Sequence, residues 1–260
     1  MALDLLTYGE ALVEMMRDTT DVPFSQSGTF IGPFPSGAPF IFAVQAARLG
    51  AQVGVVGCVG GTVDGVPDGF GQCLMNQLKT DGVEVSGVLT QTGYATGVAF
   101  ISYESNGDRD FIFHLRQAAA GQLSSELLTL PQVDRLFDGL RCLHIMGSSL
   151  SIHDDALALG VAMLERAKSQ GVRISFDPNL RPQLMSVDKA RTAFAPFLVA
   201  ADVLIPTADE LIQLMDAETL DDALASLHEI NPNCMVVLTQ GADGCRVYED
   251  GDSVDVAGYV

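Results

Sequence analysis

The segment Phe176-Asp177-Pro178-Asn179-Leu180-Arg181 decides how this chain is interpreted, because it stands where a strand passes into a loop. The residues before it, 171–176 (Gly-Val-Arg-Ile-Ser-Phe), alternate in polarity and include β-branched side chains, which is typical of a β-strand. Pro178 prevents a helix from beginning at the end of that strand. A carboxylate, a carboxamide and a guanidinium therefore stand near the carboxyl end of a strand, the edge at which open α/β sheets bind ligands.

The side chains of this loop suit an anionic ligand and a metal ion. Arg181 offers a planar fork for phosphate or carboxylate. Asp177 and Asn179 have the oxygen atoms that order a hydrated Mg²⁺. Asp, Pro and Asn are also ordinary turn residues, so the segment taken alone favours a capped turn. Other parts of the chain have to decide between the two interpretations.

Length and charge limit the fold and the partners. The chain has 260 residues, of which 48% are hydrophobic, and it suits one large α/β domain with a substantial core. Its 14 Lys and Arg against 33 Asp and Glu give a net charge of −19. Such a polyanionic surface repels nucleic acids and anionic membranes, so we expect neither as a partner.

Cysteine usage and the N-terminus indicate the compartment. Five cysteines are scattered along the chain without a C-x-x-C pair, which favours reduced thiols. The first six residues show no export signal. The apolar stretch 193–206 is too short to span a bilayer and contains Asp202. We therefore expect a cytoplasmic protein.

Strand and helix patterns alternate from about residue 40 onward. The predicted strands are 53–59, 142–146, 174–176, 203–205 and 235–238, and the predicted helices are 40–49, 70–80, 154–169, 188–198 and 221–229. Strands that are separated by helices of this length predict right-handed βαβ units and a mainly parallel sheet.

Two stretches break this alternation and look like strand pairs. The second of them, 96–115, has a Ser105-Asn106-Gly107-Asp108 turn between two apolar runs, a strong hairpin signal. We expect strands from about residues 10–35 and 96–115 to form a small antiparallel sheet that projects from the main sheet as a lid. A lid over the carboxyl edge of a parallel sheet excludes water from a reacting phosphate.

Two further strand ends carry candidate ligand-binding residues. The segment Thr239-Gln240-Gly241-Ala242-Asp243-Gly244 follows an apolar strand and allows backbone N–H groups to face an anion, although a glycine-rich hairpin explains it at least as well. Thr207 is placed to cap a helix that begins at Ala208, with Glu210 at the reciprocal capping position. The functional alternative is that Glu210 orders a Mg²⁺-bound water.

Candidate residues also occur in the first half of the chain. Ser36-Gly37-Ala38-Pro39 places small residues where a ligand could approach a helix N-terminus. Arg116, which follows the second hairpin strand, is either a solvated edge residue or a contact to a sugar hydroxyl or carboxylate. The spacing of Glu10 and Glu14 predicts that both lie on one face of the first strand.

In combination these motifs resemble those of the PfkB (ribokinase-like) carbohydrate kinases. The chain looks most like the branch that holds 2-keto-3-deoxygluconate kinases, fructokinases and related ketohexose kinases. Five weak motifs recur in the family's order and spacing over the whole chain: Gly9-Glu10, Ser36-Gly37-Ala38-Pro39, Asp177 to Arg181, Thr207 to Glu210, and Thr239-Gln240-Gly241.

The resemblance implies a ribokinase-like three-layer α/β/α sandwich with a β-lid. It implies ATP and Mg²⁺ as co-substrates, and transfer of the γ-phosphoryl group to a primary hydroxyl of 2-keto-3-deoxygluconate or a related ketohexose such as fructose or tagatose. By position, the nucleotide-binding residues would be Asn179, Thr239, Gly241 and Gly244, the metal-site residue Glu210, and the sugar-binding residues Glu14, Gly37, Arg116 and Arg181.

The chain departs from the family's motifs at several positions. Ile41 replaces a sugar-contacting Asn, Thr207 replaces the Asn of an Asn-x-x-Glu motif, and the stretch 59–71 is drawn out. Arg116 and Arg181 suit the carboxylate of a keto acid, whereas Ile41 suits a neutral ketohexose about as well. These residues therefore favour 2-keto-3-deoxygluconate only slightly over a neutral ketohexose as the substrate.

The family's general base, the Asp of a Gly-Ala-Gly-Asp segment, is expected beyond Val260. We therefore expect one kinase domain, 1–260, that is incomplete at its C-terminus and inactive by itself. The alternative is a non-catalytic sugar-binding remnant of the same fold. A homodimer could form through apolar lid residues, namely Phe100, Ile101, Phe111 and Phe113.

Overall fold

The computed structural model describes residues 2–259, which fall into two compact units. The first unit is Met1–Asp138 and the second is Gly139–Val260. The single domain 1–260 remains a prediction. None of the helices in residues 2–259 combines the length and apolar character that a bilayer crossing demands.

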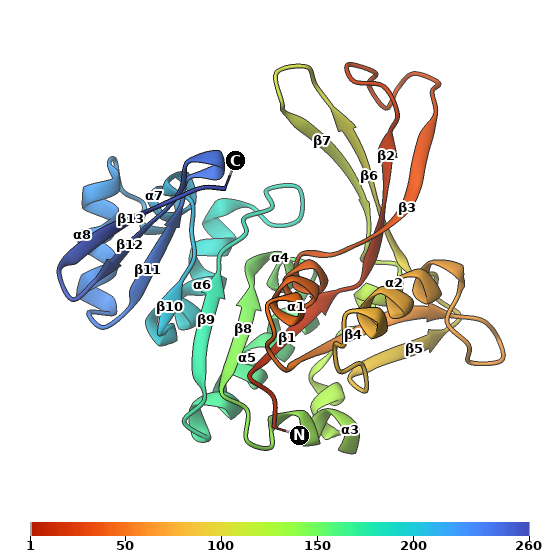
Figure 1. Ribbon diagram of the computed structural model, residues 1–260, viewed down its shortest axis with the longest axis horizontal. Helices are drawn as coiled ribbons and strands as arrows, with labels where there is room; N and C mark the ends of the chain where they lie inside the picture. The colour runs from red at the N-terminus through yellow and green to blue at the C-terminus, as the bar shows by residue number, and fades with distance from the viewer. Residues whose placement is uncertain (1, 260) are drawn as a thin grey trace. The chain divides into compact units, whose positions relative to one another are not determined.

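A parallel sheet forms the centre of the first unit (Figure 1). Its strands are β1 (Leu5–Glu10), β4 (Val53–Gly61) and β5 (Val88–Thr92), in the order β1-β4-β5, and its two long helices are α1 (Ala38–Arg48) and α2 (Gly69–Thr80). The helices bury Phe40, Leu74 and Leu78 against valines of β4. The predicted strand 53–59 and helices 40–49 and 70–80 are confirmed to within two residues.

The second sheet of this unit is called the projecting sheet below. It consists of β2 (Leu12–Arg17), β3 (Phe30–Ser36), β6 (Gly97–Tyr103) and β7 (Arg109–His114), in the order β3-β2-β6-β7. Figure 1 shows that these strands extend away from α1, α2 and β4. The hairpins β2–β3 and β6–β7 are antiparallel as predicted, but the central strands β2 and β6 pair in parallel.

The prediction that Glu10 and Glu14 share a strand face is wrong. β1 ends at Glu10 and β2 begins at Leu12, so the two carboxylates belong to different sheets. Glu14 is half-buried, and its Oε1 accepts a hydrogen bond from Ser36 Oγ at 2.6 Å. Side chains continue to alternate in direction through Ala11, so the sequence looks like one strand. This alternation does not reveal that the chain passes from one sheet to another there.

Short helical turns complete the first unit. They are η1 (Ala119–Gln122), η2 (Ser125–Thr129), α3 (Pro131–Asp134) and η3 (Arg135–Phe137). The buried side chains of Leu127, Val133 and Phe137 anchor these turns in the core.

The second unit is a four-stranded parallel sheet that ends in an antiparallel hairpin. The strands are β8 (Cys142–Met146), β9 (Arg173–Asp177), β10 (Val203–Leu204), β11 (Met235–Thr239), β12 (Gly244–Glu249) and β13 (Asp252–Ala257), which pair in sequence order. The helices are α4 (Gly147–Leu150), α5 (Asp154–Ser169), α6 (Val187–Ala200), α7 (Ala208–Met215) and α8 (Leu220–Ile230). Because β9, β10 and β11 are parallel, their carboxyl ends meet at one edge.

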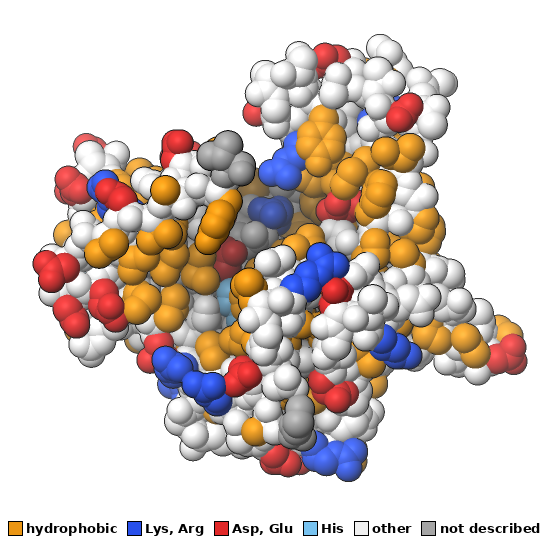
Figure 2. Space-filling model, in the orientation of Figure 1, with side chains coloured by type: hydrophobic (Ala, Val, Ile, Leu, Met, Phe, Trp, Pro, Cys, Tyr) orange, Lys and Arg blue, Asp and Glu red, His pale blue; other side chains and the backbone are white. Residues whose placement is uncertain are grey.

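Valine side chains cover one face of the strands β11, β12 and β13. The pairing places Val237, Val247 and Val254 side by side on this face, whereas Val236 and Leu238 are buried on the other. Val254 is 63% exposed. Figure 2 shows hydrophobic side chains gathered over these strands.

A hydrogen-bond cluster around Asp68 fixes the start of β6. Asp68 Oδ1 accepts hydrogen bonds from Gly71 N and Thr96 Oγ1, both at 2.7 Å, and its Oδ2 accepts one from Thr96 N at 2.7 Å. Gly60 N donates to Thr96 Oγ1 at 2.8 Å. Burial raises the pKa of Asp68, but the hydrogen bonds from Gly71 and Thr96 outweigh it and lower the pKa below its usual value. The cluster joins the end of β4, the N-terminus of α2 and the start of the projecting sheet.

Replacing Asp68 with Ala should destabilise the protein by roughly 1–3 kcal/mol, because the α2 cap is lost and Thr96 N–H loses its acceptor. The effect should be complete above about pH 4, the usual pKa of an unfolded Asp, and should shrink as pH falls through the lower folded pKa. Thermal unfolding of D68A beside D64A, a change at an exposed loop aspartate, measures this. Equal unfolding temperatures for the two variants would contradict it.

Candidate functional site at the carboxyl ends of three strands

The loop after β9 turns sharply because Asp177 bonds to its own backbone. Asp177 Oδ1 accepts a hydrogen bond from Asn179 N at 2.9 Å. Asn179 has φ 37°, in the left-handed region that Asn tolerates better than most residues. Gly147 at the start of α4 supports the turn, since any Cβ there would overlap the carbonyl oxygen of Pro178. The sequence expectation of an Asp-Pro-Asn turn is therefore met.

The loop after β10 ends in the predicted helix cap. Thr207 Oγ1 accepts a hydrogen bond from Glu210 N at 3.2 Å, and Glu210 Oε2 accepts from Thr207 N at 2.9 Å. Thr207 Oγ1 also donates to Glu210 Oε2 at 3.0 Å. This reciprocal box satisfies backbone donors at the N-terminus of α7.

The same carboxylate reaches the neighbouring loop. Glu210 Oε1 accepts a hydrogen bond from Leu180 N at 2.8 Å. Glu210 therefore ties the segment after β9 to the segment after β10, which are 30 residues apart in sequence. Its two oxygens together accept three hydrogen bonds from protein donors, so a metal ion beside it would interact through water more readily than by displacing these donors.

The third strand end joins the second through backbone contacts. Thr239 N donates to the carbonyl oxygen of Pro206 at 2.8 Å. Gly241 and Gly244 have φ 61° and 102°, and Gln240 N donates to Gly244 O at 2.8 Å, which closes a turn into β12. The glycine-rich segment is thus a hairpin. Anion binding by its backbone N–H groups stays a prediction.

Charge is concentrated at this edge of the sheet. Burial, and to a lesser extent the Glu210 carboxylate, raise the pKa of Asp177 to about 7, although the Asn179 N–H and Arg181 act in the opposite direction. Arg181 Nη1 donates to the carbonyl oxygen of Leu180 at 2.9 Å. The Oδ1 atom of Asn179 is buried and has no hydrogen-bond partner among the described residues. An ionisable carboxyl and an unpaired amide oxygen favour a bound cation or hydrogen-bond donor here.

These oxygens fit Mg²⁺ in part. In residues 2–259 no three Asp, Glu, His or Cys side chains come close enough together to hold a metal ion by themselves. Mg²⁺ usually keeps several waters and takes only one or two protein ligands, with phosphate oxygens completing its shell. Asn179 and Asp177 offer oxygen atoms for that mode of binding, and Glu210 would act through water.

Three predicted residues belong to the first unit. Gly37 has φ 101°, and a Cβ on it would overlap the carbonyl oxygen of Glu10, so only glycine fits at the start of α1. Glu14 holds Ser36 by the hydrogen bond given above. Arg116 is exposed in the turn after β7.

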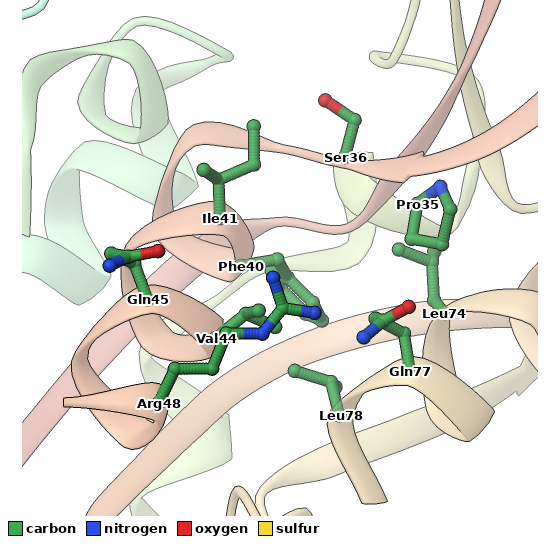
Figure 3. A pocket seen from close by; sticks show the side chains of 10 residues that line it. All are labelled: Pro35, Ser36, Phe40, Ile41, Val44, Gln45, Arg48, Leu74, Gln77 and Leu78. Carbon is green, nitrogen blue, oxygen red and sulfur yellow. The ribbon is translucent and has the colours of Figure 1, made fainter. Parts of the chain in front are cut away.

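A small cavity lies between α1 and α2 in the same unit (Figure 3). It has a volume of about 270 Å³, and Ser36 and Ile41 are among its lining residues, whereas Glu14 and Gly37 are not. Figure 3 shows Phe40 pointing toward Leu74 between the helices, while Ile41 points away from them. Its lining combines apolar side chains with the polar Ser36, Gln45, Arg48 and Gln77.

Sequence reasoning missed two features at the strand ends. The backbone N–H of Leu180 carries the link to Glu210, and no side-chain pattern encodes it. The sequence also predicts Asp177 as a residue that orders Mg²⁺, but not that its carboxyl is buried. The apolar strand before it, which ends in the fully buried Phe176, was the available signal that this carboxyl would be buried.

The family model for pfkB family carbohydrate kinases matches residues 4–259. Fructokinase-2 of Solanum lycopersicum is 30% identical over 257 residues, which cover 98% of this chain and 74% of that protein. Fructokinase-2 of Oryza sativa subsp. japonica is 29% identical over 256 residues, covering 98% and 73%.

Solved structures agree with the sequence relatives. An E. coli protein described as a ribokinase II, solved in its apo form and with ATP and Mg²⁺, is 34% identical and gives a TM-score of 0.87 over 99% of this chain and 79% of its own. A fructokinase from Xylella fastidiosa with bound ATP is 25% identical and gives a TM-score of 0.79 over 98% and 77%. The predicted ribokinase-like α/β fold is confirmed. With the family model matched from residue 4 to residue 259, the chain belongs to the pfkB family of carbohydrate kinases, phosphotransferases that act on a sugar hydroxyl.

Proposed function

We propose that the protein that carries this chain binds ATP with Mg²⁺ and transfers the γ-phosphoryl group to a primary hydroxyl of a ketohexose, with fructose as the first candidate. One observation carries the proposal. In a chain of this family, the ends of β9, β10 and β11 are joined by the Leu180–Glu210 and Thr239–Pro206 hydrogen bonds. The fructokinase relatives and the ATP-bound structural neighbours support it.

The strand ends of the second unit supply the nucleotide-binding residues of the proposal. The backbone N–H groups near Gly241 and Gly244 face the phosphates, and the Thr239 hydroxyl lies beside them. Asn179 Oδ1 and the Asp177 carboxylate hold water or metal at the phosphates, with Glu210 fixing the loop that carries them. Bound Mg²⁺ would neutralise charge on the phosphate oxygens. The protein's own contribution is positioning, which accounts for most of the catalysis in phosphoryl transfer.

Residues of the first unit supply the sugar side of the proposal. Glu14, Gly37 and Arg116 contact the sugar, and the Ser36 hydroxyl fixes the Glu14 carboxylate for that contact. Arg181 lies near the phosphates or an acid group of the substrate. Ile41 makes a neutral ketohexose acceptable, while the two arginines keep 2-keto-3-deoxygluconate as the competing substrate.

The substrate assignment is tested by measuring ADP release from the protein that carries this chain. Fructose, tagatose, 2-keto-3-deoxygluconate and ribose are compared at equal ATP and Mg²⁺. We expect kcat/KM for fructose to exceed that for ribose at least tenfold, because a pocket arranged for a ketohexose leaves polar groups unpaired with a shorter aldose. The highest kcat/KM with 2-keto-3-deoxygluconate would replace the ketohexose by the acid. No turnover with any of the four sugars would contradict a kinase function.

A matched pair of variants connects that activity to the strand ends. Asn179→Gly removes the unpaired amide while glycine accepts the positive φ, so kcat should fall by about tenfold or more with little change in unfolding temperature. Asp250→Gly is the control, since Asp250 also has positive φ, 51°, but is exposed in the β12–β13 turn. Equal activities of the two variants would remove Asn179 from the site.

The pH dependence of stability tests the burial of Asp177. Its folded pKa of about 7 lies above the usual unfolded value of about 3.9, so ionising it costs stability progressively as pH rises from about 4 to 7. Asp177→Asn keeps the acceptor for Asn179 N–H but has no charge to bury. The unfolding temperature of D177N, relative to that of the unaltered protein, should therefore rise between about pH 4 and pH 7. At pH 8 it should be several degrees higher than that of the unaltered protein. A difference that does not change with pH would contradict the raised pKa.

A further inference from the structure

We propose that the first unit carries a second ligand site, for a small phosphorylated molecule, at the amino ends of its parallel strands. The site goes beyond the proposed kinase function. A cavity of about 530 Å³ opens there, beside Leu3 and Val53, where β1 and β4 begin. Gly37, one of the proposed sugar-binding residues, lies at the opposite, carboxyl end of β1, beside Glu10. A six-residue strand separates the two ends by roughly 20 Å.

The floor of this cavity is apolar and fixed in shape. Leu3, Val53, Val83 and Leu136 line it and are each at most 7% exposed. Glu84 N donates to Val53 O at 2.8 Å, and Val55 N donates to Glu84 O at 3.2 Å, which holds the wall against β4. A floor held by strand hydrogen bonds makes the cavity preformed, as most small-molecule sites are.

Two cations without protein partners line the same cavity. Among the described residues, the side chains of only four Lys and Arg make no hydrogen bond, ion pair or ring contact: Lys79, Arg135, Arg173 and Lys189. Lys79 and Arg135 both face this cavity. With 33 acidic residues available in the chain, leaving both cations unpaired beside one cavity favours a bound anion.

The neighbouring polar groups are compatible with that anion. Gln52, Gln132 and Ser86 line the cavity and supply N–H and O–H donors. Glu84 is the acidic lining residue, and its Oε1 accepts a hydrogen bond from Ser86 N at 2.8 Å within its own loop. Asp81, the nearby acid at the end of α2, is paired with Arg48 through Nε at 2.8 Å.

The chemistry of the lining selects the class of ligand. A phosphate monoester carries close to two negative charges at neutral pH, which matches one lysine and one arginine. Its phosphate oxygens suit the guanidinium fork and the amide donors. The apolar floor and the volume leave room for a carbon body of the size of a polyol or sugar, which inorganic phosphate lacks. We therefore assign the cavity to a phosphorylated polyol or sugar.

Calorimetric titration with glycerol 3-phosphate and with inorganic phosphate tests this site. At low ionic strength glycerol 3-phosphate should bind the unaltered protein more tightly than inorganic phosphate, because the floor buries its carbon body. Binding should weaken about tenfold or more in Arg135→Gln and in Lys79→Gln, which lose a charge-assisted contact. High salt should abolish it. Equal affinities for the two probes would overturn the assignment to an organic phosphate.

Matched variants locate the binding event. Lys189→Gln and Arg173→Gln remove the other two unpaired cations and should leave the affinity unchanged. Arg181→Gln, at the nucleotide side of the proposed active site, should also leave it unchanged. If R181Q lost binding of glycerol 3-phosphate and R135Q kept it, the second site would be overturned, because the ligand would then occupy the proposed kinase site. Unfolding temperatures within a degree or two of the unaltered protein would show that R135Q and K79Q remain folded.

Discussion

The carboxylate of Glu210 is the interaction on which the candidate site depends. It accepts one hydrogen bond from the loop after β9 and two from the loop after β10, at 2.8–3.0 Å. Hydrogen bonds to an ionised carboxylate are about twice as strong as neutral ones. Without this anion, the N–H groups of Leu180 and Thr207 would lose their partner, and the part-buried N–H of Leu180 would be the costlier of the two to leave unpaired. The position of Asn179 and Arg181 relative to α7 follows from this one side chain.

The same carboxylate shapes the electrostatics of the strand ends. Placed near Asp177, it adds to the burial that raises the pKa of Asp177 to about 7. Two carboxyl groups, one arginine and an unpaired amide oxygen then face a single edge, and burying the Asp177 charge there costs stability. A magnesium–nucleotide complex would bring the positive charge that the carboxyls need and the phosphate oxygens that Arg181 needs. The stability lost in the free protein is thus the expected counterpart of ligand binding.

Local patterns in the sequence were sufficient to predict much of this architecture. The predicted strand 142–146 and helix 154–169 coincide with β8 and α5, because apolar periodicity and glycine boundaries mark both. The Thr207–Glu210 cap was predicted because both of its partners lie within one helical turn. The Asp-Pro-Asn turn was predicted for a similar reason, because its residues are neighbours in the sequence.

Features that depend on distant contacts were not predictable in this way. The parallel pairing of β2 with β6, the change of sheet between Glu10 and Glu14, and the link of Asp68 to Thr96 each join residues whose proximity is decided by the whole fold. The pKa of Asp177 depends on how deeply the packed sheet buries it. Lys79 and Arg135 share a cavity although 56 positions separate them, 135 − 79 = 56.

We place nucleotide binding at the ends of β9, β10 and β11, where Glu210 joins the first two loops and the Thr239–Pro206 hydrogen bond joins the third. Amide hydrogen exchange of the protein, with and without a non-hydrolysable ATP analogue and Mg²⁺, tests it most directly. We expect the analogue to slow exchange together in residues 178–181, 207–210 and 239–244, and Glu210→Ala to abolish this shared protection. Protection confined to other segments, or undiminished in E210A, would contradict it.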